Sequence, residues 1–147
     1  HSLDRRQRQM CIRDSYWAVT KNNPEKQKDT LTHWLKKNER TNKSTYFKKE
    51  TTKAKKAVLH YRVLKKLERY SVIEIELVTG RHHQIRCQLS AIGCPVRGDL
   101  KYGYDRSNED GGIDLHAKKI IFEHPVNGKK IIIDAPVRDT KIWNAAK

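Results

Sequence analysis

The chain has 147 residues, which suits one domain and leaves little room for two. Hydrophobic residues make up 36% and charged residues 33%, so the composition does not predict a wholly disordered chain. No apolar run reaches the roughly 18 residues that a membrane span needs, and no N-terminal stretch has the pattern of a signal peptide. The three cysteines form no disulfide framework, so we expect a soluble, cytoplasmic protein with no membrane partner.

Charge is the strongest compositional signal. Lys and Arg number 32 against 17 Asp and Glu, which gives a net charge of +15 and a pI near 9.9. Such a balance favours a polyanion as partner, and nucleic acid is the natural one. A soluble protein that is merely basic remains the alternative. A membrane surface is less favoured, because no basic amphipathic helix is visible.

The first 15 residues differ from the rest of the chain, because they show neither a helical nor a strand period. The stretch RRQRQMCIRDS within them also resembles the translation of a sequencing adapter. We therefore separate residues 1–15, as a segment foreign to the fold, from one domain at residues 16–147.

The first elements of the domain are short. Residues 16–20 (YWAVT) form an apolar run that predicts a strand. Leu31, Trp34 and Leu35 have the i, i+3, i+4 spacing of one helix face and predict a short helix. Residues 36–56 are mostly Lys, Asn, Thr and Glu, and we interpret them as an exposed loop that adds to the positive field.

Two strands and a helix are predicted next. Residues 58–64 and 72–78 alternate between apolar and polar side chains and lie close enough in sequence to pair as antiparallel neighbours. Ile85, Leu89 and Ile92 then fall at i, i+4 and i+7, which indicates a helix.

The last part of the chain completes the pattern. Gly93 occupies the position of a helix C-cap, and Pro95 prevents the helix from continuing. Residues 115–122 and 130–134 predict two more strands, and residues 142–143 are expected to pack back onto the domain. The whole pattern predicts an α+β fold with a mostly antiparallel sheet.

The segment TGRHHQIR, residues 79–86, resembles the signature of the RluA/RsuA-type RNA pseudouridine synthases. The resemblance implies that family's fold, a mixed and mainly antiparallel sheet with flanking helices, here N-terminally incomplete. It also implies conversion of uridine in rRNA or tRNA to pseudouridine, an isomerisation without cofactor or metal, by a protein that we expect to be a monomer. Further matching motifs are Tyr16-Trp17-Ala18, Gly93 with Pro95, Gly98-Asp99 with Tyr102-Gly103, Leu115-His116-Ala117 and His124-Pro125.

The chemistry explains what such residues would do. A uridine within structured RNA must be flipped out before its glycosidic bond can be reached, and an aromatic ring can stack on the flipped base. The resemblance assigns the ring to Tyr16 and assigns to Arg86 an ion pair with the catalytic aspartate. Tyr16 as core filler and Arg86 as a helix-surface residue are the alternatives. The residues expected to contact RNA are Arg81, His83, Gln84, Lys101 and Leu115.

Several of these residues also have structural interpretations. His82 and His83 suggest a metal site, but no carboxylate or thiol lies at ligand spacing, so we expect none. His83 is instead expected to bond the backbone at the turn into the helix. Leu115 is equally natural in a buried strand, and Asp99 is expected to cap the glycine-rich loop.

The match to the family's motif is weakest at the nucleophile. The family's aspartate lies in His-Arg-Leu-Asp-Arg, which makes Asp4 the matching residue. Ser2 replaces the arginine, and the Thr or Ser and Gly that should follow Arg5 are missing. We therefore weigh two hypotheses: a pseudouridine synthase that uses Asp4, and a truncated, inactive RNA-binding fragment of the same family.

Overall fold

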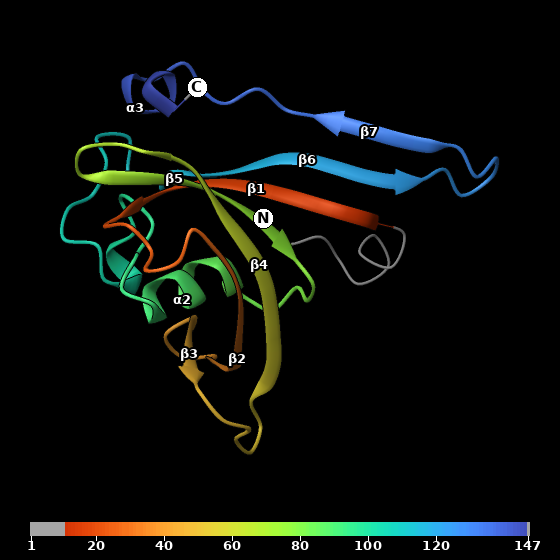
Figure 1. Ribbon diagram of the computed structural model, residues 1–147. Coiled ribbons are helices and arrows are strands. Elements are labelled where there is room, and N and C mark those ends of the chain that lie inside the picture. The colour runs from red at the N-terminus through yellow and green to blue at the C-terminus, as the bar shows by residue number, and fades with distance from the viewer. Residues whose placement is uncertain (1–10, 147) are drawn as a thin grey trace.

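The computed structural model describes residues 11–146, with side chains from residue 14 onward. The described strands form one seven-stranded sheet in the order β3-β2-β4-β5-β1-β6-β7, and all neighbouring pairs are antiparallel (Figure 1). This arrangement confirms the predicted α+β class. The elements are β1 (Cys11–Lys21), β2 (Lys28–Asn38), β3 (Lys43–Phe47), β4 (Lys55–Lys66), β5 (Tyr70–Leu77), α2 (Gln84–Ala91), a 3-10 turn η1 (Leu100–Tyr102), β6 (Leu115–Glu123), β7 (Lys130–Asp134) and α3 (Lys141–Ala146).

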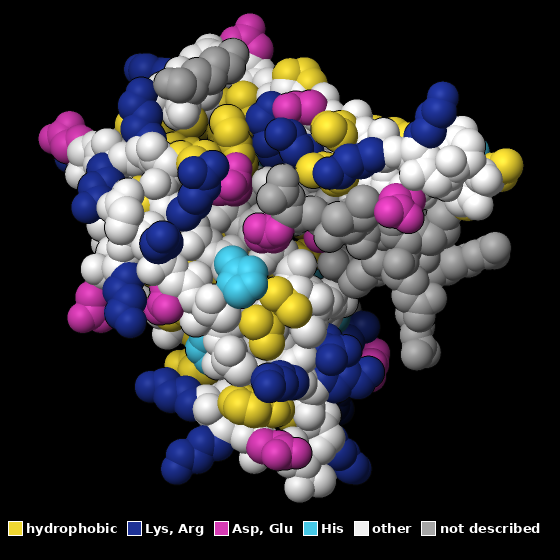
Figure 2. All heavy atoms as spheres, turned by 45° about the vertical axis from the view of Figure 1, so that its right-hand side comes forward, with side chains coloured by type: hydrophobic (Ala, Val, Ile, Leu, Met, Phe, Trp, Pro, Cys, Tyr) yellow, Lys and Arg dark blue, Asp and Glu magenta, His cyan; other side chains and the backbone are white. Residues whose placement is uncertain are grey.

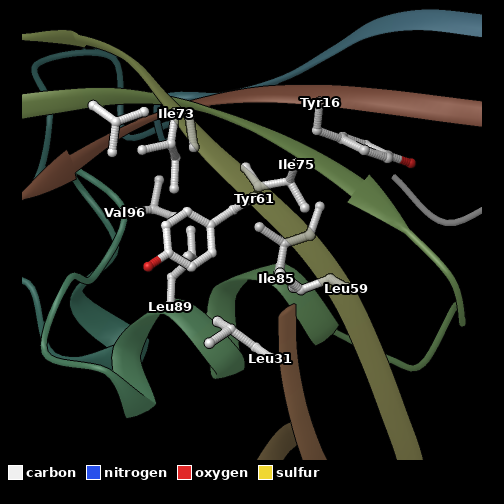
Figure 3. Close-up of a cluster of buried hydrophobic side chains, with 11 residues drawn as sticks. Tyr16, Leu31, Leu59, Tyr61, Ile73, Ile75, Ile85, Leu89 and Val96 are labelled. Carbon is white, nitrogen blue, oxygen red and sulfur yellow. The ribbon is translucent and has the colours of Figure 1, made fainter. Parts of the chain in front are cut away.

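The main core lies between the sheet and α2 (Figure 3). Successive side chains of a strand point to opposite faces, so the alternating apolar residues of β4 and β5 reach the same side. Ile85 and Leu89, one turn apart on α2, close this layer from the other side. The strand and loop residues buried here are Tyr16, Ala18, Leu31, Leu59, Tyr61, Val63, Ile73, Ile75 and Val96.

A smaller cluster covers the opposite face at one end of the sheet. Val19 and Val72 are fully buried there beneath Trp143 of α3, which is 2% exposed. The prediction that residues 142–143 pack back onto the domain is confirmed. α2 ends at Ala91 with Ile92 as its C-cap, and Gly93 follows with a φ of 80°, in the left-handed region that terminates helices. The next N–H, of Cys94, donates to the Leu89 carbonyl at 2.9 Å. Within residues 11–146, no helix is long and apolar enough to span a membrane.

The predicted helix around residues 31–35 is wrong, because these residues belong to the strand β2. Leu31, His33 and Leu35 are all buried, whereas Thr32 is exposed, so the true period is two. The interpretation missed this because His33 is polar and broke the apolar alternation. The His33 ring is buried, and its Nδ1 accepts a hydrogen bond from the Gln88 side-chain amide at 2.8 Å.

The predicted loop at residues 36–56 is also wrong in part. β2 extends to Asn38, β3 forms a hairpin with it, and β4 begins at Lys55. Ser44 is the one buried residue of β3, so the strand has no hydrophobic alternation that a sequence pattern could reveal. Backbone pairing with β2 holds β3 in place instead.

Candidate active site

A cavity of about 400 Å³ opens where β1, β6 and the loop before α2 meet. Its volume lies within the range of small-molecule binding sites. One wall is apolar and the other carries the positively charged and imidazole side chains of the loop. The lining residues are Tyr16, Leu77, Gly80, Arg81, His82, His83, Gln84, Ile85, Arg86, Ile113, Leu115 and Ala117.

This cavity brings together most of the residues singled out from the sequence. Tyr16, Arg86 and Leu115 line it, although they come from three different elements. Lys101 is exposed on η1 and lies outside the lining, but its charge helps to lower the pKa of the neighbouring histidines. Asp4 lies outside the described residues. Arg81, His83 and Gln84 complete the set of predicted residues at the cavity.

A break in the strand register lies beside Tyr16. Ser15 pairs with Lys119, but Tyr16 pairs with Ala117, so β6 has one extra residue at this point. Such a bulge bends a strand and redirects side chains. Tyr16 is 4% exposed and belongs to both the cavity wall and the main core. Tyr16 is therefore a core residue that also reaches the cavity, and its role in the site stays a prediction.

Gln84 fixes the loop that carries the signature. Its Oε1 accepts hydrogen bonds from Thr79 Oγ1 at 2.7 Å and from the Arg81 N–H at 2.9 Å. Its Nε2 donates to the Val58 carbonyl at 3.0 Å, which ties the loop to β4. The side chain is only 3% exposed, so its geometry indicates a role inside the protein rather than the RNA contact expected from the resemblance.

Arg86 forms the strongest polar interaction at the site. Its Nε and Nη2 donate to the two carboxylate oxygens of Asp99, each at 2.8 Å. Asp99 is 1% exposed, and the bidentate bond raises the pKa of Arg86. The Asp99 carboxylate makes no cap bond to η1, so its predicted capping role is wrong.

Gly98 explains how Asp99 reaches this position. Its φ is 89°, and a Cβ there would lie 2.6 Å from Asn108 Nδ2 and 2.8 Å from the Gly112 carbonyl oxygen. Only glycine fits such a left-handed turn under close neighbouring atoms. The turn allows the next residue to point its carboxylate at α2.

His83 holds the third side of the Arg86 guanidinium. Arg86 Nη1 lies 3.0 Å from His83 Nε2, and His83 Nδ1 lies 2.7 Å from the Tyr102 hydroxyl. A guanidinium can only donate, so Nε2 must accept and the ring proton must be on Nδ1. The Tyr102 oxygen then accepts from both His83 and the Ser44 N–H, the latter at 2.9 Å. The expected backbone bond of His83 is therefore wrong, since its ring bonds two side chains.

The environment of His83 opposes its protonation. Burial, followed by the charge of Arg86, lowers the pKa of His83 from 6.5 to about 4, and His82 and Lys101 act in the same direction. Only Asp99 opposes the shift. A proton on Nε2 would face the guanidinium, so acid is expected to break the His83–Arg86 hydrogen bond.

A pH dependence of stability follows. Between about pH 4 and 6.5 the unfolded chain binds a proton at His83 that the folded chain does not. The free energy of unfolding is therefore expected to rise with pH across this window, and the full contribution is present above pH 6.5. His83→Asn is expected to make this slope shallower, since Asn tolerates the residue's φ of 52°. Urea titrations of the wild type and of His83→Asn at several pH values measure the slope of the free energy of unfolding against pH.

The same titrations can contradict the account. His82 and His33 also have lowered pKa values, so some slope is expected to remain in the variant. Equal slopes in the wild type and His83→Asn would show that folding does not lower the pKa of His83.

The partners of Arg86 were the part of the site that sequence reasoning missed. The resemblance predicts an ion pair between Arg86 and a catalytic aspartate, but the partner of Arg86 among the described residues is Asp99. Ser44 and Tyr102 also belong to the network and come from β3 and η1. The Gly98-Asp99 motif was the available signal for one of them. Among the described residues, no group of three His, Cys, Asp or Glu side chains is arranged to hold a metal ion.

A second cavity, of about 450 Å³, lies on the opposite face of the sheet beside Trp17. Its charged side chains include Arg62 with Glu74 at 2.9 Å and Lys118 with Asp134 at 2.6 Å. These groups neutralise one another, so the cavity offers no charge of one sign to a ligand. The Arg86 cavity is therefore the better candidate site.

Comparisons with known proteins identify the family of the chain. Residues 2–91 match the family model described as RNA pseudouridylate synthase, which includes the whole loop before α2. An uncharacterized RNA pseudouridine synthase of Bacillus subtilis is 40% identical over 79 residues, which cover 54% of this chain and 26% of that protein. Ribosomal large subunit pseudouridine synthase D of Zymomonas mobilis is 38% identical over 85 residues, covering 52% and 27%. The chain thus matches about a quarter of the length of these relatives.

Solved structures show the same fold. Human RNA pseudouridylate synthase domain containing 1 has a TM-score of 0.74 and 22% sequence identity, covering 96% of this chain and 61% of the human chain. A second human protein, RNA pseudouridylate synthase domain containing 4, has a TM-score of 0.72 and 20% identity, covering 96% and 63%. Together with the family model, which matches more than half of the residues, these similarities confirm the resemblance carried by TGRHHQIR: the chain belongs to the RNA pseudouridylate synthase family.

Proposed function

We propose that this chain binds RNA and isomerises a uridine to pseudouridine. One observation carries the proposal: Tyr16 and Arg86, the two described residues to which the sequence resemblance assigns catalytic roles, line the same cavity together with apolar side chains. The space suits a single base flipped out of its stack. rRNA or tRNA is the proposed substrate, and three relatives named ribosomal large subunit pseudouridine synthase D favour rRNA.

Arg86 is both anchored and available. A guanidinium has five N–H donors, and bonds to Asp99 and His83 use three of them. Within the described residues, two N–H groups remain for a carboxylate or for an oxygen of the bound nucleotide. Arg86 can therefore hold a catalytic aspartate ionised without losing its own position. We propose Asp4 for that role on its match to the family's motif alone.

The rest of the site supports the rearrangement of the base. The bond between the sugar and N1 of uracil breaks, the base turns, and a new bond forms to C5. C5 loses its proton and N1 gains one, so the product is an isomer of uridine. The apolar side chains of Leu77, Ile113 and Leu115 line the cavity and exclude water from the detached base. Tyr16 offers its ring to the base.

Nucleoside analysis tests the proposal. An unmodified transcript of bacterial large-subunit rRNA is incubated with the chain, digested and separated by liquid chromatography, in which pseudouridine elutes apart from uridine. The expected result is pseudouridine that increases with time and enzyme. RNA binding without any pseudouridine, in rRNA and in tRNA transcripts alike, would overturn the catalytic part of the proposal.

A further inference from the structure

β7 presents an apolar edge with which no other strand of the described residues pairs. It lies last in the sheet order, beyond β6, and Figure 1 shows it along the outer edge of the sheet. Ile132 is 58% exposed and Ile133 is 51% exposed, and neighbouring side chains of a strand point to opposite faces. Figure 2 shows hydrophobic side chains exposed between Lys and Arg side chains at the height where Figure 1 places β7. An exposed apolar edge strand is a template for pairing with another strand.

The backbone of β7 directs every second residue outward. At one end of the β6–β7 ladder the Ala135 N–H donates to the Lys118 carbonyl at 2.8 Å, and at the other end the His124 N–H donates to the Lys129 carbonyl at 2.8 Å. Hydrogen-bonded pairs alternate along an antiparallel ladder, so the odd-numbered residues of β7 bond β6. The residues whose N–H and C=O groups point away from β6 are therefore Lys130, Ile132 and Asp134.

This edge is complementary to a second copy of itself. In an antiparallel pair centred on Ile132, that residue faces Ile132 of the second copy, and the outward groups of all three residues find partners. Lys130 then faces Asp134 of the second copy, so opposite charges meet at both ends of the pair. On the other face Ile131 meets Ile133 of the second copy. The pairing therefore covers the isoleucines that a single copy exposes.

Other pairings of the same strand fit less well. A shift by one residue places outward groups opposite groups that already bond β6. A shift by two residues separates Lys130 from Asp134, and a parallel pair in register places each Lys130 beside its copy, where like charges repel. The next outward position after β7 is Pro136, which has no N–H and ends the pairing there.

Lys118 prepares one end of this surface. Its Nζ lies 2.6 Å from Asp134 Oδ1, and the Asp134 side chain is 50% exposed. The hydrogen bond from Lys118 lowers the pKa of Asp134, which keeps the carboxylate charged. A carboxylate accepts several hydrogen bonds through its two oxygens. Asp134 can therefore bind Lys130 of a second copy without losing Lys118.

We propose that two copies of this chain associate through β7 and form one continuous sheet across a two-fold axis. The same surface of both copies meets, so assembly stops at the dimer. This differs from the monomer expected from the sequence, which becomes the state at low concentration. Two short strands form a small interface, so a dissociation constant on the order of 10 μM is expected. The proposal goes beyond the proposed function and depends on neither RNA nor activity.

Sedimentation velocity of the full chain tests the association. At about 0.15 M salt, which screens the repulsion between two chains of net charge +15, the wild type is expected to double its mass from 17.3 kDa between about 1 and 200 μM. Ile132→Pro removes an outward N–H and no hydrogen bond to β6, so it is expected to weaken association about tenfold or more. Urea unfolding measures whether each variant is folded.

Two charge variants test the register. Lys130→Asp and Asp134→Lys each place like charges opposite one another in their own dimers, so each is expected to associate about tenfold or more weakly. An equimolar mixture restores opposite charges at both ends of the pair and is expected to dimerise like the wild type. Lys129→Asp is the matched control, because it changes the net charge as Lys130→Asp does at a position that faces Ala135 of the second copy. It is expected to keep the wild-type affinity.

The same measurements can overturn the proposal. A wild type that stays at 17.3 kDa at every concentration would refute the dimer. Association that Ile132→Pro leaves unchanged, or assemblies larger than a dimer, would refute the use of β7. A mixture of the two folded charge variants that remains monomeric would refute the register centred on Ile132. None of these outcomes involves RNA, so they leave the proposed function as it stands.

Discussion

Replacing Arg86 by Met is expected to reduce pseudouridine formation by about 1,000-fold or more and to lower the free energy of unfolding by about 2–4 kcal/mol. Asp99 is 1% exposed and receives two hydrogen bonds from Arg86, so the variant leaves a buried carboxylate without its cation. Met fills much of the volume, which separates the loss of charge from the loss of packing. Single-turnover kinetics and urea unfolding measure the two effects.

A double variant separates stability from chemistry. Asp99→Asn in the Arg86→Met background removes the unpaired charge, so the double variant is expected to recover much of the lost stability. Activity is expected to remain lost, because the guanidinium acts on the bound nucleotide or its aspartate. Recovery of activity together with stability would show that Arg86 serves the fold alone. Arg86→Lys is not a conservative control, since an ammonium cannot form the two-pronged bond.

Truncation of Tyr16 is expected to have the second large effect. Tyr16 is 4% exposed and packs with Ile75 and Ile85 between β1 and α2 (Figure 3). Tyr16→Ala is expected to lower the free energy of unfolding by about 3–5 kcal/mol, as for other large aromatic residues in cores. It is also expected to abolish activity, because the ring that would stack on the base is gone.

The matched variant Tyr16→Phe keeps the ring and removes only the hydroxyl. Its stability is expected to stay within about 1.5 kcal/mol of the wild type. If the ring acts by stacking, RNA affinity is expected to survive in Tyr16→Phe. Equally weak RNA binding by the Phe and Ala variants, with the Phe variant folded, would contradict a stacking role. Fluorescence anisotropy with a labelled RNA stem–loop and urea unfolding provide both measurements.

The elements with a strong local period could be predicted from the sequence. β4 and β5 alternate clearly, and α2 repeats its apolar residues every turn, because one face of each is buried in the main core. β2 could not be found in this way. His33 occupies a buried position that the pattern reserves for an apolar residue, and its burial depends on a hydrogen bond from Gln88, 55 residues away.

The candidate site was predictable only where the family's motif covers it. Arg86 and Tyr16 were found by resemblance, and both line the cavity. The Arg86–Asp99 pair spans 13 residues, and the Ser44–Tyr102 hydrogen bond spans 58. No local period reports such contacts, because they form only when β3, α2 and η1 pack together.

The most direct test of the account compares tritium release by the wild type, Arg86→Met and the Arg86→Met/Asp99→Asn double variant. The substrate is rRNA that carries tritium at C5 of uridine, and the label passes to water when C5 replaces N1 in the bond to the sugar. We expect release by the wild type and none above background by either variant, although the double variant is folded. Release by the folded double variant at the wild-type rate would contradict the claim that the Arg86 cavity is where uridine is isomerised.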